Sequence, residues 1–375
     1  MSILKVIGAI SGTSMDGIDV ALIETDGLFH VTPLAGRLYP YAPDLRNQLQ
    51  SIIENPEIAE HGDLTEIEQA VSDAHSDAVL QFCKDICCDK KDICSDKSEI
   101  ALVGLHGQTV LHRPERNFTR QLGLGQRMAD LIGINVVNRF RHADIAAGGH
   151  GAPLVPLYHQ ALAHRFNKPL IILNLGGVAN ITYIDTQTLI AFDTGPASAL
   201  LDDFVKTRTG RPYDENGALA LSGTVNQPML DAFMSNPFFD LPPPKSLDRQ
   251  DFKLRAKCVE TLSDADGAAT LAAFTVHSVA RALQHVPKTP VQWLVAGGGR
   301  LNNCFMQGLR KLLNVTVESV DTVGWNGDFL EAECFAYLAL RSRLGLPLSL
   351  PSTTGVPEPM TGGEFWESRS STPNT

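Results

Sequence analysis

A glycine-containing turn between two strand-like segments constrains this chain more than any other feature. Residues 7–10 are apolar, and residues 18–24 alternate between apolar and polar side chains, so both segments predict strands. Glycine lets a backbone approach a ligand closely, and hydroxyl and backbone N–H groups donate to phosphate oxygens. The turn therefore predicts a phosphate-binding loop, with an ordinary hairpin turn as the alternative. It contains Gly12, Thr13, Ser14, Met15, Asp16 and Gly17.

Two carboxylates in or beside this turn, Asp16 and Asp19, are candidates for holding a magnesium ion. Mg²⁺ prefers carboxylate and phosphate oxygens, and Asp16 is the residue that we assign to it. The stretch is not a Walker A loop, because it lacks the Gly-Lys-Ser/Thr sequence and no helix follows it. We therefore expect a phosphate site built on a strand, a turn and a second strand.

Length and charge limit the classes of function. The 375 residues are enough for two domains, and 43% hydrophobic with 19% charged residues is typical of a soluble globular protein. A net charge of -11 argues against nucleic acid or an anionic membrane as a partner, because both favour basic surfaces. No apolar run is as long as a membrane span and the start lacks a signal-peptide pattern, so we expect a cytoplasmic protein.

Four of the seven cysteines lie between Cys83 and Cys94. Their spacing matches no zinc motif, and an odd number of cysteines argues against a disulfide framework. We expect ordinary thiols there and assign them no role.

Polar residues follow an apolar strand at residues 100–105, and His106 is the first of them. Open α/β sheets place ligand groups at such strand ends, although a structural imidazole is an equally good interpretation. The loop at residues 139–153 contains Arg141 and Asp144, is rich in glycine, and is long enough to indicate a functional loop.

A second strand, glycine turn and strand begins near residue 170, with Gly176 and Gly177 in the turn. The same unit early in each half predicts a duplicated fold that binds a nucleotide between its halves. We expect a first α/β domain at 1–154 completed by a C-terminal helix at 329–350, a second at 155–328, and a mobile tail at 351–375.

Asp193 lies where an apolar strand at 189–192 ends, just before a helical pattern. A carboxylate held there by rigid elements suits a general base, whereas helix capping or turn formation is the structural alternative. Residues 207–250 are rich in Pro, Gly, Asp and Asn, which predicts a segment that covers a site as a lid.

A strand at 291–296 runs into three glycines and then into a helix, an arrangement that suits a nucleotide's phosphate, ribose or purine. The residues are Gly297, Gly298, Gly299 and Asn302, and a tight strand-to-helix turn is the alternative. Glu331 lies near the start of a later helix, where a carboxylate also stabilises the helix dipole.

Six motifs, taken together and in this order, closely resemble those of the anhydro-N-acetylmuramic acid kinases. They are Ser11–Asp19, Gly104–Thr109, Ala147–Pro156, Asn174–Gly177, Phe192–Pro196 and Gly297–Gly299. The resemblance extends from residue 6 to about residue 340. It implies a two-domain actin-like ATPase and sugar kinase fold of the α/β class, with ATP and Mg²⁺ as cofactors. The implied reaction converts 1,6-anhydro-N-acetylmuramic acid and water into N-acetylmuramic acid 6-phosphate, in peptidoglycan recycling.

The resemblance also implies roles for residues. Asp193 matches the catalytic base, and Gly12 to Asp19, including Ile18, match the ATP-phosphate loop. Gly176, Gly177, Gly297, Gly298, Gly299 and Asn302 complete the expected ATP site, and His106, Arg141, Asp144 and Glu331 are our candidates for sugar contacts. The chain departs from the family pattern at His142, Ala143, His150 and Ser198, which leaves the fine substrate preference open.

Two alternatives remain beside this kinase. One is a non-catalytic actin-like ATP-binding switch, and the other is a kinase of the same superfamily that acts on another sugar. We expect a small-molecule substrate with neither nucleic acid nor membrane as a partner, and a homodimer stays open as the oligomeric state.

Overall fold

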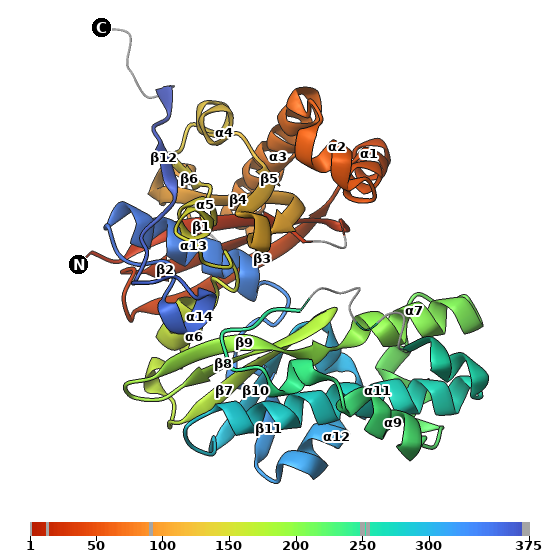
Figure 1. The fold of residues 1–375 in the computed structure, drawn as a ribbon. Helices are drawn as coiled ribbons and strands as arrows, with labels where there is room; N and C mark the ends of the chain where they lie inside the picture. Colours follow the sequence, from red (N-terminus) through yellow and green to blue (C-terminus); the bar gives the residue numbers. More distant parts are fainter. Residues whose placement is uncertain (1, 13–14, 90–92, 248–251, 253–255, 370–375) are drawn as a thin grey trace, which may run out of the picture. The chain divides into compact units, whose positions relative to one another are not determined.

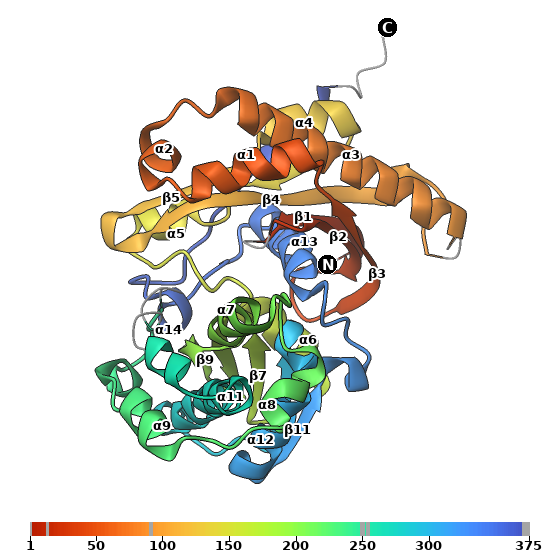
Figure 2. The ribbon, with the colours of Figure 1, turned by 90° about the vertical axis from the view of Figure 1, so that its right-hand side faces the viewer.

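The chain divides into two compact α/β units (Figures 1 and 2). The computed structural model describes residues 2–12, 15–89, 93–247, 252 and 256–369. Unit 1 comprises Met1–His164 and Phe329–Thr375, and unit 2 comprises Arg165–Asp328. The division falls after His164 rather than after residue 154, because α6 (Pro156–Leu162) packs with unit 1. Its Tyr158 hydroxyl donates to the Glu333 carboxylate on α13 (Leu330–Arg343) over 2.7 Å.

Unit 1 is built on one mixed sheet with the strand order β12-β6-β4-β1-β2-β3, and β5 pairs with β4. β1, β2 and β3 form an antiparallel meander, whereas β4 runs parallel to β1 and β6 runs parallel to β4. The strands are β1 (Leu4–Ser11), β2 (Gly17–Thr25), β3 (Val31–Pro40), β4 (Ile100–Arg113), β5 (Phe118–Leu122), β6 (Val136–Asn138) and β12 (Glu364–Trp366).

Helices cover both faces of this sheet. α13 lies against one face so closely that a Cβ on Gly8 would come within 1.8 Å of the Ala332 carbonyl oxygen. Ile7 and Ala9 point to the opposite face, where they join the core formed with α3. The other helices of unit 1 are α1 (Pro43–Ile53), α2 (Pro56–His61), α3 (Thr65–Asp89), α4 (Gly125–Ile132), α5 (His142–Ala146) and α14 (Pro351–Thr354), with short 3-10 helices at Lys97–Glu99, Pro114–Arg116 and Ala163–Arg165.

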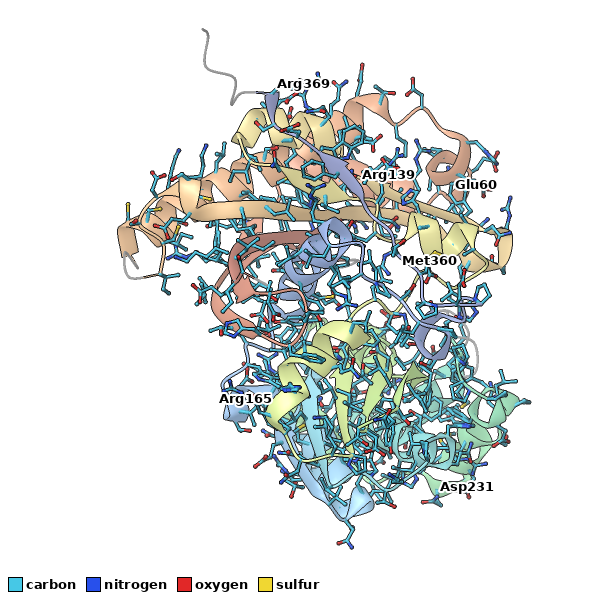
Figure 3. All side chains as sticks on the ribbon, turned by 90° about the vertical axis from the view of Figure 1, so that its left-hand side faces the viewer. Glu60, Arg139, Arg165, Asp231, Met360 and Arg369 are labelled. Carbon is cyan, nitrogen blue, oxygen red and sulfur yellow. The ribbon has the colours of Figure 1, made fainter. Side chains whose placement is uncertain are left out.

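The segment at 351–369, which the sequence predicts to be a mobile tail, is instead part of unit 1. β12 pairs with β6, and the Trp366 indole donates to the Asn138 side chain over 2.9 Å. Arg139, labelled in Figure 3, forms a 3.1 Å ion pair with Glu364. The prediction from composition failed because these partners lie far away in sequence. Residues 370–375 lie outside the described residues.

Unit 2 contains a second sheet with the order β11-β10-β7-β8-β9. β7, β8 and β9 form an antiparallel meander, and β10 and β11 add parallel strands beside β7. Unit 1 has the same arrangement around β1, so the predicted duplication is confirmed in the topology. The strands are β7 (Leu170–Leu175), β8 (Val178–Ile184), β9 (Leu189–Pro196), β10 (Gln292–Ala296) and β11 (Thr316–Ser319).

The helices of unit 2 pack against this sheet around a core that includes the fully buried Trp293. They are α7 (Ser198–Thr209), α8 (Ala218–Leu221), α9 (Gln227–Met234), α11 (Asp264–Arg281) and α12 (Asn303–Leu313), with 3-10 helices at Glu215–Gly217, Pro237–Asp240, Lys257–Thr261, Ala282–His285, Gly298–Leu301 and Val320–Val323. Across the described part of both units, no helix has the length and apolarity needed to cross a membrane. The structure describes all seven cysteines, and none of them is part of a disulfide.

Candidate functional site

The predicted phosphate loop is the turn between β1 and β2 in unit 1. Met15 has a φ of 55°, and its N–H donates to the Gly12 carbonyl over 3.2 Å, which closes the turn. A Cβ on Gly17 would come within 2.4 Å of the Tyr39 carbonyl oxygen, so this position requires glycine. Ile18 and Asp19 belong to β2 rather than to the turn. Thr13 and Ser14 lie outside the described residues.

A buried glutamine from β4, which the sequence patterns do not single out, holds the start of this loop. Gln108 is fully buried; its Oε1 accepts from the Ser11 hydroxyl at 2.5 Å, and its Nε2 donates to the Gly12 carbonyl at 3.3 Å. The pairing of β4 with β1 shifts by one residue at His106, and this β-bulge places Gln108 opposite Ser11. The sequence feature that could have indicated this role is the position of Gln108 in the strand-end motif at 104–109.

Asp16 is the predicted magnesium residue. Its side chain is 62% exposed and forms a 3.1 Å ion pair with Arg46. An exposed ion pair contributes at most about 1 kcal/mol, so the carboxylate can leave it at small cost. Mg²⁺ is commonly held by one or two carboxylates plus substrate phosphates, and an accessible carboxylate beside a phosphate loop suits that mode.

His106 and Arg141, two of the predicted sugar contacts, touch each other. The Arg141 Nε–H donates to His106 Nε2 over 3.0 Å, so His106 carries its proton on Nδ1, which lies 3.0 Å from the Gly107 carbonyl. Burial lowers the pKa of His106 well below its usual value, with the Arg141 charge as the second cause. Because protein groups occupy both ring nitrogens, His106 orients Arg141 rather than presenting a free nitrogen to a ligand. The imidazole also stacks on Phe335 at 4.4 Å.

Glu331, an exposed residue at the start of α13, is the acidic group with the largest electrostatic effect on Arg141. Burial lowers the pKa of Arg141, and the negative charge of Glu331 is the largest influence in the opposite direction. The Arg141 Nη1 donates to the Gly151 carbonyl over 2.7 Å, which fixes the guanidinium against the glycine-rich loop. The structure therefore brings His106, Arg141 and Glu331 together within unit 1.

Asp144 braces the glycine-rich loop from inside. It is 2% exposed; it accepts from the Gly151 N–H at 2.6 Å and from the Thr354 hydroxyl at 2.6 Å, and the Ser349 hydroxyl donates to it as well. A carboxylate with three donors and so little exposure ties the loop to residues 349–354. The prediction of a direct sugar contact therefore changes to a structural role.

Asp193, the predicted base, lies in β9 of unit 2. The strand continues to Pro196, and its pairing with β8 shifts by one residue next to Asp193, so the carboxylate sits at a β-bulge instead of on a turn. The Leu247 N–H donates to its Oδ2 over 2.8 Å. Burial raises the pKa of Asp193 to about 6, and the Leu247 hydrogen bond opposes that effect.

A pocket of about 280 Å³ in unit 2 is lined in part by residues of the predicted nucleotide site. Three predicted residues, Gly298, Gly299 and Asn302, line it. Sequence reasoning had not assigned its other lining residues, which are Ser198, Asp202, Tyr213, Asp214, Asn216, Leu301 and Phe305. Three of them come from the segment at 207–250, and its polar composition is the sequence feature that could have indicated a role at the site. These three residues belong to the wall of the pocket, and a lid at 207–250 stays a prediction.

Local geometry requires glycine at position 297 but not at position 298. Gly297 has a φ of 75°, and a Cβ there would come within 2.4 Å of the Asn174 Oδ1, whereas a Cβ on Gly298 would meet nothing within 4 Å. Asn302 caps α12, since its Oδ1 accepts from the N–H groups of Cys304 and Phe305. Gly176 and Gly177 form the β7–β8 hairpin. The carbonyl of Gly176 accepts from the Ser198 N–H over 3.0 Å.

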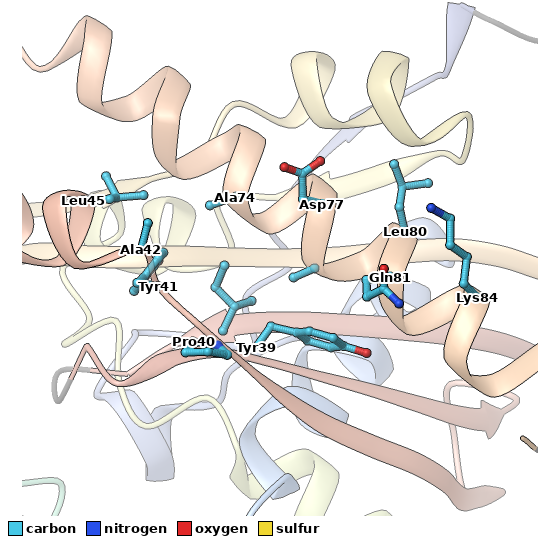
Figure 4. Close-up of a pocket in the computed structure, with 12 residues that line it drawn as sticks. Tyr39, Pro40, Tyr41, Ala42, Leu45, Ala74, Asp77, Leu80, Gln81 and Lys84 are labelled. Atoms are coloured by element: carbon cyan, nitrogen blue, oxygen red, sulfur yellow. The ribbon is translucent and has the colours of Figure 1, made fainter.

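A larger pocket of about 460 Å³ lies in unit 1 between the end of β3, α1 and α3 (Figure 4). Ile18 lines it, together with apolar side chains such as Tyr39 and Leu45 and the polar Asp77 and Lys84. Ile18 is the one predicted site residue among those that line it, so size alone does not select the pocket with the most predicted residues.

Comparisons with known proteins assign the chain to a family. The model of the anhydro-N-acetylmuramic acid kinase family matches residues 4–367. A protein of that name from Rhizorhabdus wittichii is 47% identical over 375 residues, covering 97% of this chain and 99% of the relative. Another from Rhodospirillum rubrum is 45% identical, covering 96% and 93%. Among solved structures, the activator of the 2-hydroxyisocaproyl-CoA dehydratase from Clostridium difficile with bound ADPNP matches with a TM-score of 0.45 at 10% identity, covering 91% and 96%.

The agreement of the family model with nearly the whole chain, and of full-length relatives at this identity, confirms the resemblance carried by the sequence motifs. This chain belongs to the anhydro-N-acetylmuramic acid kinase family.

Proposed function

We propose that this chain uses ATP and water to convert 1,6-anhydro-N-acetylmuramic acid into N-acetylmuramic acid 6-phosphate in the cytoplasm, as a step of peptidoglycan recycling. The observation that carries the proposal is the match of the family model to residues 4–367. The geometry of the individual units supports it with a half-buried carboxylate, a glycine turn after β1 and a pocket of suitable size.

Asp193 acts as the general base in this proposal. It takes a proton from the water that attacks the anomeric carbon, and O6 leaves that carbon and accepts the γ-phosphoryl group. Because the departing oxygen receives a phosphoryl group, it needs no strong acid, and one carboxylate suffices instead of the pair used by ordinary glycosidases. A pKa of about 6 keeps Asp193 largely ionised at neutral pH yet more basic than an exposed carboxylate.

ATP is bound through two sets of residues. The turn after β1, held by Gln108, binds phosphate oxygens through its backbone, and the pocket beside Gly298, Gly299 and Asn302 takes the nucleoside. A nucleoside-sized pocket of about 280 Å³ supports the second assignment. Mg²⁺ supplies positive charge to the phosphates, and Asp16 is the residue that would hold it.

The sugar contacts are Arg141 and Glu331. The substrate carries a carboxylate, and a guanidinium is the side chain that binds carboxylates best because it offers parallel N–H donors. His106 and Asp144 act indirectly in this proposal: His106 positions Arg141, and Asp144 positions the loop at Gly151.

A coupled assay of ADP release with the anhydro sugar, followed by mass determination of the product, tests the proposal. We expect Asp193→Asn to abolish turnover while ATP binding stays largely intact, and full turnover in that variant would refute the role of the base. Nucleotide-dependent shape change without sugar turnover would instead support an ATP-binding switch. Turnover only on other sugars would support another kinase of the superfamily. Light scattering would decide whether the chain is a homodimer.

A further inference from the structure

A buried lysine in unit 2 has no part in the reaction proposed above. Lys245 is 8% exposed, and its ammonium donates to the carbonyls of Phe238 and Phe239 over 3.0 and 3.1 Å. The ammonium also lies 4.8 Å from the centre of the Phe238 ring and 5.6 Å from that of Phe192. A buried cation held by carbonyls and aromatic faces is costly, so its presence requires an explanation.

The backbone around Lys245 contacts the proposed base at two points. The Asp193 N–H donates to the Lys245 carbonyl over 3.0 Å, and the Leu247 N–H donates to the Asp193 carboxylate over 2.8 Å. β9 is the last strand of its sheet, so its outward N–H groups need partners outside the sheet. Residues 243–247, which we name the strap, supply such a partner at the position of Asp193.

We infer that Lys245 is a positioning residue for Asp193: its ammonium anchors the strap to the Phe238 and Phe239 carbonyls, and the strap holds the carboxylate through the Leu247 N–H. The inference rests on the proposed function, because it gives the strap a role only if Asp193 is the base. It adds a residue to the reaction that has no direct contact with the Asp193 side chain and acts through the backbone.

The charges around Lys245 agree with this role. Burial lowers the pKa of Lys245 to about 8, Asp240 opposes that effect and Arg281 adds to it. The Nε2 of His285 lies 3.3 Å from the ammonium. Lys245 therefore keeps its charge at neutral pH and can donate to both carbonyls. The causes that set the pKa of Asp193 are burial and the Leu247 N–H, so the strap affects the carboxylate through this donor.

The test is Lys245→Met, with Lys288→Met as the matched control. Lys288 is in the same unit, is 65% exposed and pairs with Asp185 at 2.8 Å, so its replacement removes a lysine without touching the strap. We expect Lys245→Met to lower kcat about tenfold or more, since small misplacements of a catalytic group have effects of this size, with the KM for ATP within about twofold. The acid limb of the kcat/KM profile should move upward, because the carboxylate loses the Leu247 N–H that lowers its pKa. Lys245→Arg should restore part of the rate.

A folded Lys245→Met variant with the kcat and acid limb of Lys288→Met would overturn the inference. If Lys245→Met fails to fold, Lys245→Gln decides by the same readouts, because its amide still donates to one carbonyl without the charge. The proposed function fails separately: turnover in Asp193→Asn would remove the base itself. If Asp193→Asn is inactive and Lys245→Met is unaffected, only the positioning role of Lys245 and the strap is refuted.

Discussion

Replacing the proposed base should stabilise the protein while it abolishes turnover. Burial raises the pKa of Asp193 from 3.8 to about 6 in the folded chain. The folded state therefore binds this proton more tightly than the unfolded state does, and the stability of the wild type falls as pH rises from about 4 to 6. A difference of about two pKa units corresponds to about 3 kcal/mol of unfolding free energy at pH 7. Because the residue is only half-buried, we expect Asp193→Asn to raise the unfolding free energy at pH 7 by about 1–2 kcal/mol rather than by the full amount.

Urea unfolding at several pH values, followed by tryptophan fluorescence, measures this effect, because Trp293 is fully buried in unit 2. The stability difference between Asp193→Asn and the wild type should be near zero at pH 4 and grow up to pH 7. Asp185→Asn is the control with the opposite sign, since the hydrogen bond from Lys288 lowers the pKa of Asp185. A variant at position 193 that is less stable than the wild type at pH 7 would refute the reasoning.

Three further predictions concern the proposed nucleotide and base residues. Gln108→Glu, isosteric but unable to donate to the Gly12 carbonyl, should raise the KM for ATP about tenfold and leave that for the sugar unchanged in steady-state assays. Gly297→Ala should lower the unfolding free energy by about 2 kcal/mol or more, whereas Gly298→Ala should change it by less than about 0.5 kcal/mol; equal losses in urea titrations would contradict this. Finally, kcat/KM should fall about tenfold per pH unit below about pH 6, as Asp193 must be ionised to act as a base, and a flat profile would exclude that role.

Local patterns in the sequence were sufficient for the elements that carry the site. The alternation around Gly12 and Gly17, and the apolar run before Gly176, predicted two hairpins, and both are present as β1–β2 and β7–β8. Strand periodicity and glycine conformation depend on neighbouring residues, so they can be read without a tertiary structure. For the same reason the duplicated arrangement was predictable.

The chemical surroundings of the side chains were decided by the tertiary structure. Asp144 and Thr354 are 210 residues apart in the chain, yet their side chains share a hydrogen bond, and this changed a predicted sugar contact into a brace. Similarly, Arg141 occupies the ring nitrogen that would have made His106 a ligand.

The sequence by itself determined the family, the α/β class and the repeated strand–turn–strand unit, because motif order and hydrophobic periodicity are properties of the chain. Only the fold decided the partners of Asp193, the buried Lys245 beside it and the lining of the pocket at Asn302. The physical reason is that burial and hydrogen bonding depend on which distant segments meet, and neither is encoded in the residues next to each side chain.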